Sequence, residues 1–186
     1  IGGFSQRIYD EARRLIALID DIIRLSQLDE GQAGVQAERI DLLPLFQEII
    51  GQLEAPARQM DVAVCLAGPD AAIHGARPVV SEVLYNLLSN AIKYNKPGGR
   101  VDISILELEH DVCISIQDTG IGIPADQQEK IFERFYRVDK SHSKETGGTG
   151  LGLAIVKHGV DALGGRIELE SEAGSGTTIR ILLPRQ

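Results

Sequence analysis

Apolar residues recur at helical spacing in the first 30 residues and alternate at strand spacing in several later segments. Ile8, Leu15 and Ile22 follow one another every seven residues, and further apolar positions widen this stripe. So wide an apolar arc favours a helix of a bundle or coiled coil whose partner helices lie elsewhere. The alternative is that the helix packs on the rest of the chain. Glycines at 31 and 34 end the pattern, so we expect one unit over residues 1–32 and a second over residues 35–186.

The second unit combines helices with strands of antiparallel character. A helix is expected from Asp41, as its N-cap, to Leu53, with Pro56 ending or kinking it, and helical periodicity also marks residues 78–95 and 150–163. Alternation predicts strands at 62–66, 72–74, 101–108, 112–117, 167–170 and 177–183. This order predicts an α/β (α+β) fold, a two-layer sandwich of a mixed, largely antiparallel sheet covered by helices on one face, preceded by an N-terminal bundle helix.

Composition narrows the function classes. The chain has 186 residues and a formal net charge of -8, which argues against a nucleic-acid coat and against binding to anionic membranes. The two cysteines, Cys65 and Cys113, lie in apolar runs and are predicted to be buried thiols. Because the only methionine is Met60, we expect the chain to be a piece of a longer protein.

One face of the helix predicted at 78–95 is polar. Glu82, Asn86, Asn90 and Lys93 fall within an arc of roughly 80°, opposite a run of apolar residues. Two interpretations are open. The face is either solvated, or it is an oxygen-ligand site in which amide oxygens hold a hard cation such as Mg²⁺ and Lys93 meets phosphate.

Glycine clusters occupy residues 118–124, 147–153 and 174–177. The second cluster resembles a phosphate cradle, because glycine permits close backbone approach and a helix follows it. It matches neither the dinucleotide fingerprint nor the P-loop, however. Asp118 ends a strand before a Gly-x-Gly turn. It is either the side chain of an Asx turn or the acceptor for a buried amino group.

The order of the motifs carries a resemblance to a known family. The chain presents E-x-x-x-N-x-x-x-N-A-x-K-Y, then D-x-G-x-G-I-P, F-E-R-F-Y-R, T-G-G-T-G-L-G-L and G-S-G-T-T. Over residues 35–184 this resembles the ATP-binding catalytic domain of sensor histidine kinases, whose fold is shared with gyrase, MutL-type and heat-shock-chaperone ATPases. Residues 1–30 resemble the second helix of the family's dimerization and histidine-phosphotransfer hairpin.

The resemblance implies a role for each matching residue. Asn86 would bind Mg²⁺, Glu82 would help to activate the attacking group, and Lys93 and Arg137 would complete the catalytic set. Asp118 would accept the adenine amino group. The implied ATP-binding residues are Asn86, Asn90, Lys93, Tyr94, Asp118, Gly120, Gly122, Ile123, Phe135, Arg137, Lys144, Gly148, Thr149, Gly150, Leu151, Gly152 and Thr177.

The chain departs from the family in one important respect, because the His-Glu-x-x-x-Pro phosphoacceptor box is absent. We expect the acceptor histidine to precede Ile1. The resemblance then implies a protein-histidine kinase that uses ATP and Mg²⁺ and donates the γ-phosphoryl group to this histidine for relay to a response regulator. It implies a homodimer and the cytoplasmic portion of a membrane-anchored bacterial sensor, with no nucleic-acid partner. The alternatives are an ATPase or anti-sigma-type protein kinase of the same fold, or a pseudokinase scaffold.

Overall fold

A computed structural model describes residues 2–29, 36–138 and 149–185. The helices are α1 (Gly2–Asp29), α2 (Leu42–Gln59), α3 (Arg77–Lys93) and α5 (Gly152–Ala162), with short 3-10 helices η1 (Ala125–Gln127) and η2 (Lys130–Phe132). The strands are β1 (Glu38–Asp41), β2 (Ala63–Ala67), β3 (Ala72–Gly75), β4 (Arg100–Glu107), β5 (Asp111–Asp118), β6 (Arg166–Glu172) and β7 (Gly176–Pro184). No helix in these ranges has the length and apolar character needed to cross a membrane.

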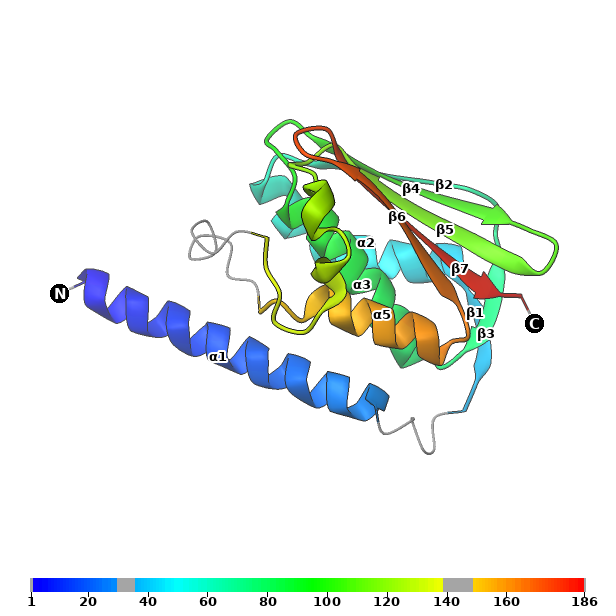
Figure 1. The fold of residues 1–186 in the computed structure, drawn as a ribbon, viewed down its shortest axis with the longest axis horizontal. Helices are drawn as coiled ribbons and strands as arrows, with labels where there is room; N and C mark the ends of the chain where they lie inside the picture. Colours follow the sequence, from blue (N-terminus) through cyan, green and yellow to red (C-terminus); the bar gives the residue numbers. More distant parts are fainter. Residues whose placement is uncertain (1, 30–35, 139–148, 186) are drawn as a thin grey trace.

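The larger sheet has five strands in the order β2-β4-β5-β7-β6. Strands β2 and β4 pair in parallel, and every other neighbouring pair is antiparallel. Helices α2, α3 and α5 cover one face of this sheet, as Figure 1 shows. The predicted two-layer sandwich with a mixed, largely antiparallel sheet is therefore confirmed.

The core lies between the sheet and the helices α2, α3 and α5 that cover it. Alternate residues of the central strands turn toward the helices and are buried: Val101, Ile103, Ile105, Val112, Ile114, Ile116, Ile179, Ile181 and Leu183. They meet the apolar face of α3, formed by Val79, Val80, Val83, Leu84, Leu87, Leu88, Ala91 and Ile92. Burying this face fixes the rotation of α3 about its axis, so its polar face is turned away from the sheet.

Helix α2 ends later than predicted, and its N-cap is the predicted residue. The helix continues past Pro56 to Gln59. Pro56 is exposed and lies in the last turn, where the carbonyl it leaves without a helical partner can bond to water. Asp41 does occupy the N-cap position, but its side chain makes no cap hydrogen bond and instead accepts one from Arg39 Nε at 3.1 Å.

Strand β1 was not predicted, and both cysteines are less buried than predicted. Strand β1 pairs antiparallel with β3 in a separate two-stranded sheet. Cys65 is exposed and Cys113 is half-buried, because both point to the face of the five-stranded sheet that the helices leave uncovered. Ile40 is the residue that β1 contributes to the core.

Helix α1 runs along the outside of α5 (Figure 1). Leu25 is buried against Leu151 and Ile155, and Leu18 packs at the edge of this contact. The other apolar positions of the stripe remain 45–60% exposed: Ile8, Tyr9, Leu15, Ile16, Ile19, Ile22 and Ile23. One edge of the stripe therefore packs on this chain, as the second interpretation predicts, and the bundle interpretation stays a prediction for these exposed positions.

Candidate functional site

The polar face of α3 lies half-buried beside the start of α5. Asn86 Nδ2 donates hydrogen bonds of 2.9 Å to both the backbone carbonyl and Oε1 of Glu82, one turn earlier. These bonds turn Asn86 Oδ1 toward Gly152, where a methyl group would lie only 3.0 Å from that oxygen and 3.5 Å from Asn90 Nδ2. Both asparagines therefore face the N-terminal end of α5, where free backbone N–H groups favour an anion.

The turn before α5 is fastened to the segment that follows η2. Phe135 N donates a hydrogen bond of 2.9 Å to Gly150 O. Gly150 has a φ of +77°, and a side chain there would press on the Phe135 backbone at 3.0 Å. This position requires glycine for both reasons. Arg137 follows two residues later, so the same contact brings it toward the polar face of α3.

Lys93 is held in an environment that disfavours its charge. Burial and the nearby Arg137 guanidinium lower the pKa of Lys93 from 10.5 to about 8, while Asp21 of α1 acts in the opposite direction. Its ammonium lies 5.3 Å from the centre of the Tyr94 ring, a distance at which a cation is attracted to the ring face. An anionic ligand beside Lys93 and Arg137 would relieve their mutual repulsion.

Asp118 is the last residue of β5, and the turn that follows it packs on the backbone of Tyr94. Its Oδ1 accepts hydrogen bonds from Gly120 N at 2.8 Å and Thr177 N at 3.2 Å. Burial raises the pKa of Asp118, and these two hydrogen bonds partly oppose that rise. The Asx turn is thus present, and because both bonds end on Oδ1, it leaves Oδ2 as a second acceptor. The two interpretations of Asp118 are therefore compatible.

The two glycines of the D-x-G-x-G turn, Gly120 and Gly122, allow the turn to pack closely on neighbouring backbone. A methyl group on Gly120 would collide with the carbonyl oxygen of Tyr94, and one on Gly122 with that of Glu172. Gly122 also has a φ of +64°. Ile123 N donates to Ser171 Oγ at 2.8 Å. These contacts seat the turn against the β6–β7 hairpin, and thereby help to hold Asp118 in place.

Two other predicted site residues, Leu151 and Thr149, have side chains that contact α1. Leu151 is fully buried in the contact with α1, so only its backbone can face a nucleotide. Thr149 Oγ1 donates a hydrogen bond of 2.6 Å to Asp21 of α1 and accepts one from Leu151 N at 3.3 Å. Lys144 and Gly148 lie outside the described residues.

Sequence reasoning missed three polar residues that support Asp118. Asn95 and Thr119 form a hydrogen-bonded network beneath the turn, and Ser171 Oγ lies 2.8 Å from Thr177 Oγ1. Thr119 stands inside a motif that the sequence singled out, and Asn95 directly follows one. Their positions were therefore visible, but nothing in the local pattern shows which groups they contact.

Comparison with known proteins gives one consistent family. Residues 75–186 match the family described as histidine kinase-, DNA gyrase B- and HSP90-like ATPase. Sensor histidine kinase WalK of Bacillus subtilis (strain 168) is 40% identical over 178 residues, which cover 94% of this chain and 29% of the relative. Sensor-like histidine kinase SenX3 of Mycolicibacterium smegmatis is 35% identical, over 97% of this chain and 47% of the relative. The chain thus spans less than half of each of these proteins.

Solved structures agree on the fold. The mycobacterial sensor histidine kinase MprB has a TM-score of 0.69 and 29% identity, with 79% of this chain and 96% of that chain covered. The predicted resemblance to sensor histidine kinases is confirmed by these relatives. The individual roles of the site residues remain predictions.

Proposed function

The chain belongs to the family of histidine kinase-, DNA gyrase B- and HSP90-like ATPases, and from that premise we propose that it binds Mg·ATP along the polar face of α3 as the catalytic part of a sensor histidine kinase. The observation that carries the proposal is the placement of two different groups beside one helix. Asn86 and Asn90 face the N-terminal end of α5, and the Asp118 turn packs on the backbone of Tyr94. Asn86 and Tyr94 are about 12 Å apart along the helix axis, a span suited to a nucleotide that has its base at one end and its terminal phosphate at the other.

At the base end, Asp118 is the recognising group. Its carboxylate is held by two backbone N–H groups on Oδ1, so Oδ2 would accept the exocyclic amino group of adenine. Guanine presents a carbonyl oxygen at the corresponding position, and two acceptors would then face each other without a hydrogen. Because a buried polar group without a partner is costly, the site should favour adenine.

At the phosphate end, the donor set suits a magnesium ion that is shared with phosphate. Asn86 offers one amide oxygen, and no cluster of three or more His, Cys, Asp or Glu side chains that could hold a metal occurs among the described residues. This fits Mg²⁺, which is commonly bound by few protein oxygens together with waters and substrate phosphates. When bound, Mg²⁺ neutralises phosphate charge; Lys93, Arg137 and the backbone N–H groups at the start of α5 would hold the remaining phosphate oxygens.

The reaction that this site supports is phosphoryl transfer. In such reactions the protein contributes chiefly by positioning the reactants and by stabilising charge. We infer that the intact protein transfers the γ-phosphoryl group to a histidine on a helix that precedes α1, with Glu82 beside the attacking group. The acceptor helix and a second copy of the chain would cover the exposed apolar stripe of α1, and a response regulator would take the phosphoryl group in turn.

Calorimetric titration with a non-hydrolysable ATP analogue tests the proposal. Wild type should bind it with an affinity that rises with Mg²⁺ and exceeds the affinity for the GTP analogue. Asn86→Ala should remove the effect of Mg²⁺, whereas Gln52→Ala, which removes an exposed amide from α2, should change nothing. Transfer to a separately supplied histidine-bearing helix is the second step. Absence of nucleotide binding by the folded wild type would refute the proposal and favour a scaffold.

A further inference from the structure

A buried polar network lies beneath the turn that carries Asp118. Asn95 directly follows the C-cap of α3 and, at 6% exposed, is the one polar side chain in the described residues that is buried. Its Nδ2 donates to Ala91 O at 3.2 Å and to Arg100 O at 3.0 Å. Its Oδ1 accepts from Lys96 N at 3.0 Å and from Thr119 Oγ1 at 3.2 Å. All the hydrogen-bonding capacity of this amide is therefore used.

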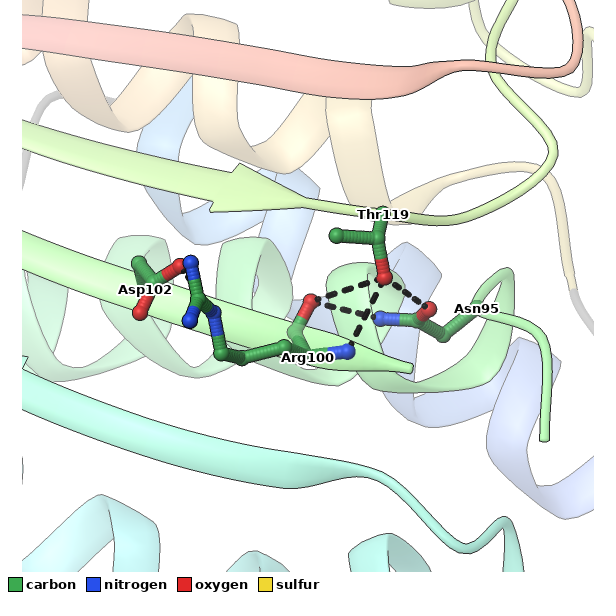
Figure 2. A network of polar contacts seen from close by, with 4 residues as sticks. All are labelled: Asn95, Arg100, Asp102 and Thr119. Atoms are coloured by element: carbon green, nitrogen blue, oxygen red, sulfur yellow. Dashed lines mark hydrogen bonds and ion pairs between the residues drawn. The ribbon is translucent and has the colours of Figure 1, made fainter. Parts of the chain in front are cut away.

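Thr119 connects this amide to the turn, as Figure 2 shows. Its hydroxyl donates to Asn95 Oδ1 and accepts a hydrogen bond of 2.9 Å from Arg100 N. Its backbone N–H donates to Arg100 O at 3.1 Å. One threonine thus joins the end of α3 to the first residue of β4 through both its side chain and its backbone.

The two residues that follow Thr119 carry this restraint to the base site. Ile121 N donates to Tyr94 O at 3.1 Å, and Gly120 N holds Asp118 Oδ1 at 2.8 Å. The turn cannot shift toward α3, because Gly120 already packs on the Tyr94 backbone. If the Thr119 hydroxyl is removed, Asn95 Oδ1 and Arg100 N each lose a partner. The turn then loses its side-chain attachment beneath Asp118 and keeps only the backbone hydrogen bonds of Thr119 and Ile121.

We propose that Asn95 and Thr119 are positioning residues that fix the carboxylate of Asp118 and thereby set the preference of the site for adenine. This inference rests on the proposed function. Discrimination by a hydrogen bond depends on a rigid acceptor, because a carboxylate that can move or admit water tolerates a base without the amino group. Every hydrogen bond of the network joins two groups of the protein, so the position of the acceptor does not depend on contacts with a nucleotide.

The decisive measurement compares ATP with purine riboside triphosphate, which lacks the 6-amino group, on the full 186-residue chain. Thr119→Val keeps the branched shape and removes the hydroxyl, and Thr119→Ser restores the hydroxyl. Thr119→Val should reduce the ratio of the two affinities by about fivefold, the size expected for one hydrogen bond, and Thr119→Ser should return the ratio to near the wild-type value. Asp102→Asn is the matched control, because Asp102 bonds to the exposed Arg100 guanidinium at 2.6 Å in the same cluster.

Each outcome has one meaning. An unchanged ratio in folded Thr119→Val, even with a lowered melting temperature, would show that the network only stabilises the fold. Failure of Thr119→Ser to restore the ratio would overturn the role of the hydroxyl. If Thr119→Val does not fold, Thr119→Ala removes the same hydroxyl with less bulk and is judged by the same ratio. If wild type binds no ATP, the proposed function itself has failed. That result is distinct from a failure of this inference, which requires a wild type that binds ATP.

Discussion

The substitution Gly152→Ala should weaken nucleotide binding while leaving the stability of the fold nearly unchanged. Gly152 is the first residue of α5, and its φ lies in the ordinary range for side chains. Alanine in place of glycine within a helix stabilises by roughly 0.5–1 kcal/mol. The added methyl group would lie 3.0 Å from Asn86 Oδ1, a tight contact that offsets part of this gain. We therefore expect a melting temperature close to that of wild type.

The effect on binding should be much larger. Magnesium binds its oxygen ligands at about 2.1 Å, so an ion held by Asn86 Oδ1 would need the space that the methyl group would occupy. Loss of one charged contact costs roughly 1.5–3 kcal/mol, which corresponds to about a 10- to 150-fold weaker affinity. The loss should appear in the presence of Mg²⁺ and be small without it.

Calorimetric titration with the ATP analogue, with and without Mg²⁺, measures both affinities. Gly51→Ala is the matched control, because Gly51 is an exposed helical glycine of α2 with nothing within 4 Å of the added methyl group. It should gain stability and bind as wild type does. If Gly152→Ala is folded and keeps the full effect of Mg²⁺, Asn86 Oδ1 does not face the ion and the reasoning is wrong.

Four further predictions concern Lys93 and α1. Because phosphate favours the charged lysine, whose pKa is about 8 in the free chain, binding near pH 8–9 should take up a proton. Titration in buffers of different ionisation enthalpy measures this uptake, and Lys93→Met should remove it. Since the folded pKa lies below the usual 10.5, the unfolded chain binds more protons between pH 8 and 10.5, and the free energy of unfolding of wild type relative to Lys93→Met should rise across this window. Asp21→Asn should lower the pKa of Lys93 further, because the Asp21 carboxylate raises it; a lower pH midpoint of proton uptake would show this. Leu25→Asp should release α1 from α5, seen as faster hydrogen exchange in α1 with α3 unchanged.

The sequence predicts best where one periodic pattern decides the structure. The apolar face of α3 and the alternation in β4, β5 and β7 each repeat over several turns or residue pairs, and their bounds agree closely with the structure. Strand β1 has four residues, of which only Ile40 is buried. Its pairing with β3 joins segments more than 30 residues apart, so no local pattern could reveal it.

The same distinction applies to the site. The D-x-G-x-G motif identifies Asp118, but the partners that hold it come from Tyr94, Asn95 and the β6–β7 turn. Such contacts depend on how turns from separate segments meet, and turn geometry is encoded weakly by single residues. The contact of Asp21 with Thr149 joins residues 128 positions apart, which is why the sequence could describe α1 but not locate it.

The polar face of α3 allowed two interpretations from the sequence, and the electrostatics of Lys93 favour the ligand site over the solvated face. A solvated face would leave a lysine near its ordinary pKa, because water stabilises the charge. Lys93 instead is buried enough to lower its pKa, with the Arg137 guanidinium adding repulsion. A protein gains no stability by placing two cations together in a partly buried site, so this arrangement is a cost to the free chain. Groups perturbed in this way gather at functional sites, and under the proposed function the phosphates of a nucleotide would supply the opposite charge beside Lys93 and Arg137.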